Sequence, residues 1–302
     1  MRITNGMQSA SMLRSLQGSG ERSMKLQEQL STGRRINRPS DDPVGVSRLL
    51  RLNRDLSENE QYTKNAQDAK AVLDATDTAL GGIDDILQRL HEIAISGANG
   101  TLPQASKDAL ADEVNELLGQ LEQIGNTTYS GIYIFAGEKV DTEPYTLTGG
   151  PPYTGATFNG NDGKRSYEIA PGIKDTVNLT GHAEVFGDET TQNSIFDHVI
   201  QLRDALRADD NTIIESSIDV MSDDLDNIIN LRSVIGAKYN KMDLTLDRLS
   251  TANTTITQQI ADSGDTDVAK AIIQLKMEEN VYQSALAVGS RIIPPSLADY
   301  LT

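Results

Sequence analysis

The feature that most constrains this chain is an apolar repeat in its C-terminal half. From Ile214 to Ile260, apolar side chains recur in alternating steps of four and three residues. The mean spacing of 3.5 residues is that of a left-handed coiled coil, whereas a surface helix of a globular domain repeats every 3.6. A continuous helix of this length would extend about 70 Å at ~1.5 Å per residue. We therefore expect an elongated helix that packs lengthwise on other helices.

Two further stripes with the same steps supply partners for this helix. One runs from Tyr62 to Leu90 and the other from Leu110 to Ile124, with Gly and Pro in the turn between them. These segments predict antiparallel helices and a bundle whose core is built in layers. Polar residues interrupt the stripes and are expected to fix the register of the helices. They are Thr76, Arg232 and Asn253.

The composition changes between Tyr129 and about Thr191, where Gly, Pro, Thr and Tyr dominate. Short alternating runs bounded by turn residues are typical of β-hairpins. We therefore predict a small β-rich insertion in a mainly α-helical fold. Residues 159–163 (NGNDG) lack the acidic spacing and the closing Glu of a calcium loop, so we expect a tight hairpin turn there.

Charge and composition argue against several classes of function. The net charge of −17 opposes binding to nucleic acid, although residues 1–54 hold ten Lys/Arg against four Asp/Glu. The chain has no Cys, so it has no disulfide scaffold and no thiolate metal site. No apolar run approaches the roughly 18 residues of a membrane span. The first residues lack the apolar core and cleavage site of a secretory signal.

The residues typical of an active site are also missing. The histidines, His91, His182 and His198, are not at ligand spacing, and no Gly-x-Ser-x-Gly motif or phosphate-binding loop occurs. Asp41 and Asp42 are adjacent and indicate a helix cap rather than an acid–base pair. We expect no enzymatic activity, no metal and no cofactor.

Both ends of the chain carry the same four-three spacing, from Met12 to Leu30 and from Val268 to Ile293. Burying five apolar side chains at ~2 kcal/mol each gains about 10 kcal/mol. Ordering the 26 residues of the last segment costs roughly 40 kcal/mol at ~1.5 kcal/mol per residue. We therefore expect both segments to be loose in the monomer and to become ordered with each other and with neighbouring copies.

The stretch LSTGRRINRPSDDPVGVSRL, residues 30–49, interrupts the helices near the start of the chain. Leu30 ends an amphipathic helix, and Gly33 is suited to cap it. Asp42 and Pro43 indicate the N-cap and first residue of the next helix. The passage predicts a rigid joint whose charges contact adjacent copies.

This stretch closely resembles the N-terminal motif of the flagellin superfamily, LSxGxRIN followed by paired aspartates. The form INRPSDDPVG resembles the hook–filament junction subfamily, because filament flagellins usually have small residues in place of the prolines. Residues 126–146 are similar to the family's GxYxFxGxxTxxxPF passage, with Tyr145 in place of Phe and Asp141 before the Thr. The C-terminal residues 282–302 also resemble the end of a junction protein.

The resemblance implies a structural subunit of the bacterial flagellum that forms the layer between hook and filament and supports flagellin assembly. The terminal helices, residues 1–38 and 266–302, would pair into an inner coiled coil on assembly. Residues 39–138 and 192–265 would form the helical bundle rod, and residues 139–191 the outer β-rich insertion. The alternatives are a filament flagellin or, more distantly, a non-flagellar coiled-coil adaptor.

The implied partners are further copies of this chain, the first hook-associated protein, flagellin, an export chaperone and the flagellar type III secretion apparatus. The implied location is the extracellular flagellum, reached without a cleavable signal peptide; no membrane insertion is expected. Assembly contacts are expected from the terminal helices and the joint. The residues are Leu16, Leu26, Leu30, Arg34, Arg35, Ile36, Asn37, Arg38, Pro39, Asp41, Asp42, Pro43, Ile272, Leu275, Tyr282, Leu286 and Ile293.

Overall fold

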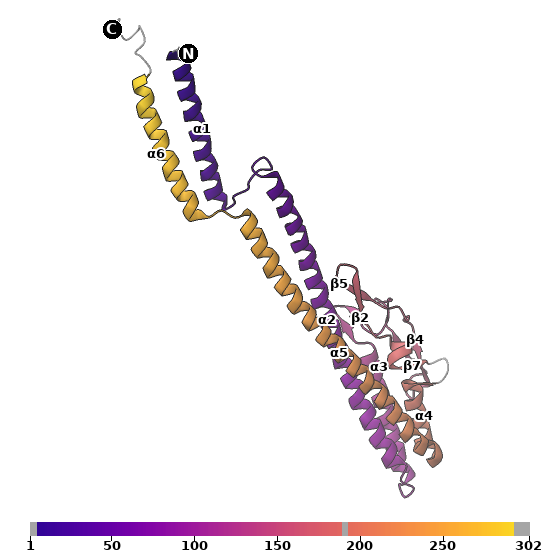
Figure 1. Ribbon diagram of the computed structural model, residues 1–302. Helices are drawn as coiled ribbons and strands as arrows, with labels where there is room; N and C mark the ends of the chain where they lie inside the picture. The colour runs from indigo at the N-terminus through magenta and orange to yellow at the C-terminus, as the bar shows by residue number, and fades with distance from the viewer. Residues whose placement is uncertain (1–4, 189–192, 293–302) are drawn as a thin grey trace. The chain divides into compact units, whose positions relative to one another are not determined.

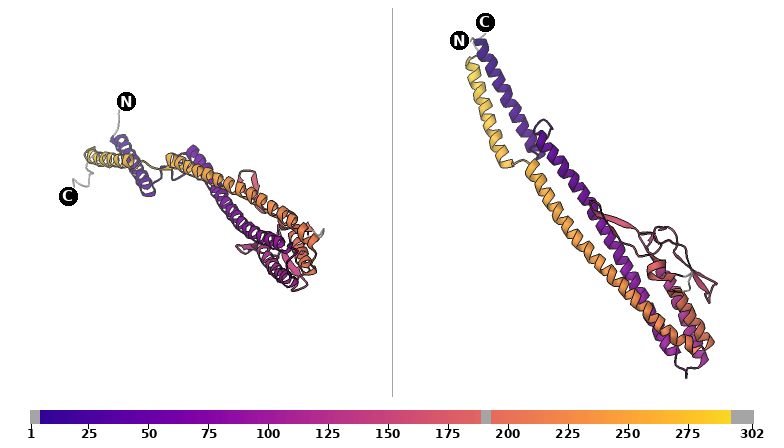
Figure 2. Two further views of the ribbon diagram at one scale, coloured as in Figure 1. Left: turned by 90° about the horizontal axis from the view of Figure 1, so that it is seen from below. Right: turned by 45° about the vertical axis from the view of Figure 1, so that its right-hand side comes forward.

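The computed structural model describes residues 5–188 and 193–292 (Figures 1 and 2). The fold is mainly α-helical, with small antiparallel strand pairs, as the sequence predicts. The helices are α1 (Asn5–Thr32), α2 (Pro43–Gly97), α3 (Gln104–Gly125), α4 (Ile195–Ala208), α5 (Asn211–Gly264) and α6 (Val268–Ile292). Two compact units result: a terminal unit of residues 1–58 and 252–302, and a middle unit of residues 59–251.

The predicted long helix is confirmed as α5. In the middle unit its side chains at seven-residue intervals are buried, and the intervening stripe positions are partly buried. The buried set is Ile214, Met221, Ile228, Ile235, Met242 and Leu249. One stripe of a coiled-coil repeat therefore carries the core, because only a repeat of 3.5 residues stays on one side of so long a helix.

Helix α2 runs antiparallel to α5 in the middle unit (Figure 1). The stripe positions from Ala66 to Leu90 are buried without exception. Asn59 Nδ2 donates to the carbonyl of Leu249 (2.9 Å), and Lys70 pairs with Asp243 further along. The helix that begins at Pro43 and the stripe from Tyr62 to Leu90 belong to one continuous helix. Residues 57–61 (SENEQ) contain no Gly or Pro that would end it.

Arg232 fixes the register of α2 and α5, as predicted. Its Nε donates to Asp77 Oδ1 (3.2 Å) and its Nη1 to Asp84 Oδ2 (3.4 Å), so one side chain spans two carboxylates one heptad apart. Thr76 is buried, and its hydroxyl donates to the carbonyl of Val72 in its own helix, so its role in the register stays a prediction. Asn253 is partly buried in the terminal unit.

Helices α3 and α4 complete the helical part of the middle unit. α3 begins after Pro103, as the sequence indicates, and Glu113 on α3 accepts from Arg89 Nε on α2 at 2.7 Å. α4 packs against α3 and begins with a capping box in which Ser194 and Asp197 satisfy each other's backbone N–H groups.

The β-rich segment consists of antiparallel pairs with two strands each, in the described residues. They are β1 (Thr128–Tyr129) with β2 (Ile132–Tyr133), β3 (Tyr145–Thr148) with β4 (Gly155–Phe158), β5 (Ser166–Ala170) with β6 (Ile173–Thr176), and β7 (Gly187–Asp188) with β8 (Asn193–Ser194). A π-helical turn, η1 (Gly181–Val185), precedes β7. The prediction of a tight hairpin turn at residues 159–163 is wrong. This loop joins β4 to β5, which belong to different pairs, and Asn161 Oδ1 holds it by accepting from the backbone N–H of Glu138 (2.7 Å).

In the terminal unit, α1 and α6 lie side by side and antiparallel (Figure 1 and the right-hand view of Figure 2). The first turns of α2 pack beside the last turns of α5, where Gly264 leaves room for Leu49. Among the described residues, no helix is both long and apolar enough to cross a membrane. Ile293 lies outside the described residues.

Candidate functional site

The candidate site lies in the terminal unit and has two parts. The terminal pair consists of α1 and α6, and the joint consists of residues 33–42 between α1 and α2. Both parts carry residues that the sequence predicts for assembly.

Glu278 is the polar centre of the terminal pair. Its carboxylate accepts from Ser19 Oγ (2.9 Å) and from Arg22 Nε (2.8 Å) and Nη2 (3.1 Å), which gives a bidentate ion pair between the helices. The hydrogen bond from Arg22, followed by the one from Ser19, holds the pKa of Glu278 below its usual value. Sequence reasoning missed Glu278, because its partners lie more than 250 positions away.

Small residues bring α6 close to α1. Ala271 and Gly289 are buried, and Gly289 faces Met12. The face of α6 that meets α1 therefore differs in part from the predicted stripe. Leu275 is partly buried, whereas Ile272, Tyr282 and Leu286 remain between 40% and 48% exposed. A pattern of small residues at 271, 285 and 289 could have indicated this close approach.

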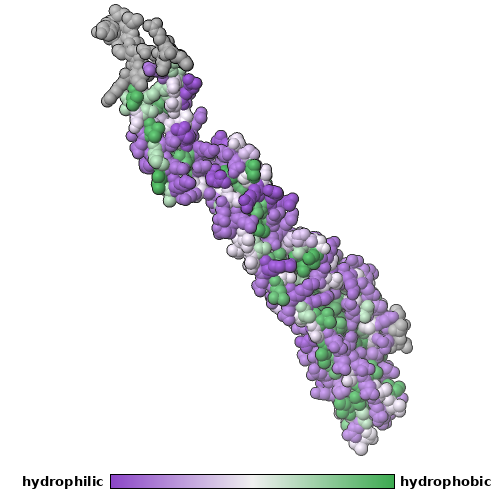
Figure 3. All heavy atoms as spheres, viewed as in Figure 1, coloured by the Kyte–Doolittle hydropathy of each residue, from purple (hydrophilic) through white to green (hydrophobic). Residues whose placement is uncertain are grey.

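The remaining large apolar side chains of the terminal pair form an exposed apolar surface (Figure 3). Figure 3 shows hydrophobic atoms along α6. On α1, the predicted residues Leu16, Leu26 and Leu30 are partly buried. The exposed residues are Met7, Leu13 and Met24 on α1, and Val268, Ile272, Ile273, Met277, Val281, Tyr282, Leu286 and Val288 on α6. Exposure of so many large apolar side chains on two paired helices is typical of a surface that another protein covers.

The joint is hydrogen-bonded to the connection between α5 and α6. Gly33 caps α1 with a φ of 69°, as its predicted role requires, and its carbonyl accepts from Thr266 N (2.9 Å). Arg35 N donates to the carbonyl of Gly264 (2.7 Å), and Ile36 is buried. These contacts agree with the rigid joint that the sequence predicts.

Both aspartates of the joint accept hydrogen bonds from backbone N–H groups, Asp41 within the loop and Asp42 at the start of α2. Asp41 Oδ2 accepts from the backbone N–H groups of Asn37 (3.3 Å) and Arg38 (3.0 Å), and its Oδ1 pairs with Lys25 (2.8 Å). The hydrogen bond from Lys25, then that from Arg38, lowers the pKa of Asp41. Asp42 Oδ1 accepts from Gly45 N (2.9 Å) and caps α2, which begins at Pro43 as predicted.

Most charges of the joint have partners within the chain. Arg38 Nη2 lies 3.3 Å from Glu28, and Arg35 Nη1 lies 3.7 Å from Asp42. Within the described part of the chain, no hydrogen bond or ion pair engages the side chain of Arg34, which is exposed. Pro39 and Pro43 are exposed as well. Intersubunit contacts by these residues stay a prediction.

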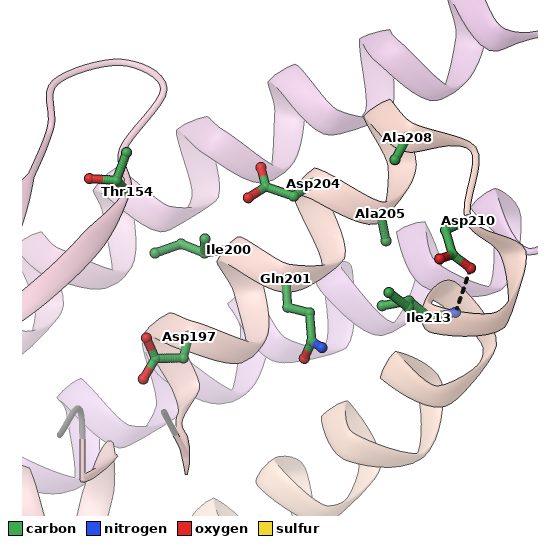
Figure 4. A pocket seen from close by; sticks show the side chains of 9 residues that line it. All are labelled: Thr154, Asp197, Ile200, Gln201, Asp204, Ala205, Ala208, Asp210 and Ile213. Atoms are coloured by element: carbon green, nitrogen blue, oxygen red, sulfur yellow. Dashed lines mark hydrogen bonds between the residues drawn. The ribbon is translucent and has the colours of Figure 1, made fainter. Parts of the chain in front are cut away.

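The middle unit contains a pocket of about 470 Å³ between α4, the start of α5 and the loop before β4 (Figure 4). Three carboxylates line it, and each has a local structural role. Asp197 completes the capping box of α4, Asp204 pairs with Arg203 (2.6 Å), and Asp210 accepts from Ile213 N (3.3 Å). Among the described residues, no cluster of three or more His, Cys, Asp or Glu has the arrangement of a metal site.

The sequence of the chain is similar to those of flagellar proteins. Residues 3–140 match the family model of the bacterial flagellin N-terminal helical region. Flagellar hook-associated protein 3 of Escherichia coli K12 is 29% identical over 94% of this chain and 95% of its own length. The chain is similar to flagellar structural proteins over nearly its whole length. The resemblance found in the joint is thereby confirmed.

The chain is also similar to a flagellin in sequence and to a solved hook-associated protein in fold. A flagellin of Halalkalibacterium halodurans is 24% identical over 87% of this chain and 85% of its own length, a weaker match. A solved flagellar hook-associated protein from Vibrio parahaemolyticus superposes with a TM-score of 0.67 at 23% identity, covering 74% of this chain and all of that one. The second likeness shows that the two proteins share a fold.

Proposed function

We propose that this flagellin-like chain is the subunit that joins the flagellar hook to the filament. The observation that carries the proposal is its likeness to hook-associated protein 3, which extends over nearly the whole length of both chains. The match to flagellin is weaker. The prolines in INRPSDDPVG agree with the junction type.

The exposed apolar surface of the terminal pair supports this function. A monomer of this size rarely leaves so many large apolar side chains on one pair of helices. If the same helices of neighbouring copies covered these side chains, the burial of each would stabilise the assembly by up to about 1.5–3 kcal/mol. The terminal helices, residues 1–38 and 266–302, would then form the inner layer of an assembly.

The proposed partners are further copies of the chain, the first hook-associated protein on the hook side and flagellin on the filament side. An export chaperone and the flagellar type III apparatus would deliver the chain to the extracellular flagellum. We propose a purely structural role without catalysis. Its relatives are structural flagellar proteins, and the carboxylates of the pocket beside α4 serve local caps and pairs.

Deletion of the gene in its motile host tests the proposal. We expect intact hooks, flagellin released into the medium and no attached filaments, because the filament would have no layer on which to assemble. Electron microscopy of the cells and an immunoblot of the medium measure both results. Normal filaments on the deletion strain would contradict the proposal.

Immunogold labelling separates the proposal from its alternative, a filament flagellin. Antibody raised against residues 139–191 is expected to label a narrow band where hook and filament meet. Labelling along the whole filament would instead identify the chain as a filament subunit.

A further inference from the structure

Arg165 lies in the middle unit, directly before β5, and its backbone is held on both sides. Its N–H donates to Asn178 Oδ1 (2.7 Å), and its carbonyl accepts from Val177 N (3.1 Å). The backbone of the residue is therefore fixed, and the direction in which its side chain leaves the strand is set by the fold.

The guanidinium of Arg165 has two buried donors without acceptors. Nε and Nη2 are inaccessible to water, and neither makes a hydrogen bond. These two nitrogens lie on the same edge of the guanidinium, the edge that binds both oxygens of a carboxylate side by side. No carboxylate of the described residues lies within ion-pair distance of this side chain.

Burial of the guanidinium lowers the pKa of Arg165 from its ordinary value, because desolvation penalises the charged form. A buried charge without a partner is unfavourable, and a carboxylate that pairs with it removes that penalty. The site is therefore incomplete in the isolated chain.

A pocket of about 220 Å³ adjoins Arg165. Its wall is formed by Val72 on α2, by Tyr129 and Ser130 of the first hairpin, and by Tyr167 on β5. Ligand sites for small molecules usually occupy about 300–1,000 Å³, so this pocket suits a single side chain better. Asp68 also lines it but does not reach ion-pair distance of Arg165.

We propose that this pocket receives the carboxylate of an Asp or Glu side chain from a second copy of this chain, which Arg165 binds through Nε and Nη2. The guanidinium turns into the pocket as the carboxylate enters, a rotamer change of the kind that interfaces often show. The inference rests on the proposed function, in which copies lie side by side.

The charge of the chain indicates why another copy supplies the carboxylate. The middle unit holds 32 Asp/Glu against 14 Lys/Arg, a net charge of −18. Copies placed side by side therefore present many acidic side chains to each other, and an unpaired arginine offsets part of their repulsion. Charge complementarity of this kind fixes the register of neighbours.

Cross-linking of the Arg165→Lys variant tests the proposal in assembled flagella. Carbodiimide joins lysine to a carboxylate without a spacer, so we expect a dimer band in a denaturing gel and a cross-linked peptide between position 165 and an Asp or Glu of another copy. Mass spectrometry of mixed isotope-labelled copies identifies links between chains. Arg89→Lys is the matched control, because Arg89 pairs with Glu113 in its own chain and should give only internal links.

Three results overturn the proposal: no cross-link at position 165, links only to Asp68 of the same chain, or links only to flagellin or a hook protein. If the variant reaches the junction but does not cross-link, this inference fails and the proposed function stands. If wild-type protein is absent from the junction, the proposed function fails.

Thermal unfolding of the free chain gives a second readout. Arg165→Gln removes the unpaired charge, so we expect the Tm of the monomer to stay unchanged or rise. A fall of several degrees would show that the guanidinium stabilises its own chain, and it would overturn the proposal.

Discussion

At the scale of single residues, the aromatic side chains explain how a chain with few of them builds a β-rich segment. Three of the four Phe rings contact Tyr145, at centroid distances of 5.2 Å for Phe158, 4.7 Å for Phe186 and 5.0 Å for Phe196. Phe135, the fourth, packs edge-on against Phe186. Tyr145 is fully buried, so the Tyr that departs from the family motif still fills an aromatic core position.

Gly137, the last glycine of the GIYIFAG passage, should be intolerant of a side chain. Its φ is 71°, and a Cβ would overlap the carbonyl oxygen of Asn161. We expect Gly137→Ala to lower the free energy of unfolding by about 1–3 kcal/mol. Chemical denaturation measures the change.

Two alanine variants serve as controls for that substitution. Gly119 lies within α3 with open space around it, so Gly119→Ala should stabilise the chain by up to ~1 kcal/mol. Gly131 has a φ of 80° without close neighbours, so Gly131→Ala isolates the backbone strain. If Gly137→Ala behaved like Gly119→Ala, the overlap with Asn161 would be refuted.

Glu278 makes the terminal pair sensitive to acid. Its folded pKa lies below its unfolded value of about 4.3, so its stabilising effect is complete above that value and is lost as the pH falls through the folded pKa. Between pH 5 and 8 the pairing of α1 and α6 should not depend on this group. The helicity of α1 and α6 should decrease when the pH is lowered below about 4, and NMR of the monomer measures it.

Glu278→Gln is the control for the acid sensitivity. Gln carries no charge for Arg22 to pair with and takes up no proton in acid, so the terminal pair of the variant should be weaker at neutral pH and should change less on acidification. An unchanged acid transition in the variant would assign the effect to other carboxylates, such as Asp41 in the joint.

At the scale of elements, the sequence predicts helices well and their contact faces less well. The repeat in α5 identifies both the helix and its buried positions, because one stripe carries the core over many turns. The face of α6 was only partly predicted, because small residues rather than large ones meet α1. The four-three spacing marks apolar positions but does not say whether a helix partner or another molecule covers them.

The joint was predictable at this scale because its signals are local. Gly33 ends α1, and Asp42 with Pro43 starts α2, as cap chemistry requires. The partners of Arg35 and Asp41 were not predictable, because they come from Gly264 and Lys25 in other elements. Contacts distant in sequence have no signature in one chain.

Hydrogen exchange should distinguish the two units in the dilute monomer. The terminal pair buries mainly small side chains and leaves large ones exposed, so amides of α1 and α6 should exchange faster than amides of α2 and α5 within residues 59–251. Mass spectrometry of peptides measures the difference. Equal protection throughout the chain would contradict the prediction that the ends become ordered on assembly.

At the scale of the whole molecule, charge and exposed apolar surface are divided between the units. The middle unit has a net charge of −18, whereas the terminal unit has 13 Lys/Arg and 12 Asp/Glu. Like charges keep middle units of separate copies apart in solution. The nearly neutral terminal unit with its apolar surface is therefore suited to hold copies together.

The sequence motifs indicated the likeness to flagellar proteins, because the joint and the GIYIFAG passage combine specific residues at specific spacing. The contacts between copies were not predictable in the same way. A motif indicates which proteins are similar, but it does not indicate through which surfaces two copies contact each other. The exposure of Ile272, Tyr282 and Leu286 supplies that information only once α6 is packed on α1.

The central claim is that the exposed apolar surface of the terminal pair holds the assembly together. The triple variant Ile272→Ser, Tyr282→Ser, Leu286→Ser removes three of the large side chains of this surface and leaves the buried Ala271 and Gly289 of α6 in place. The control is Ile229→Ser, Val234→Ser, Leu244→Ser, three exposed apolar residues of α5 in the middle unit. Both variants should be exported and should unfold at the wild-type temperature.

The most direct test is swimming motility of the deletion strain that carries each triple variant, with electron microscopy of the hooks. The account predicts bare hooks and no swimming for the α6 variant, and attached filaments with normal swimming for the control. Normal filaments on cells that carry the α6 variant would contradict it.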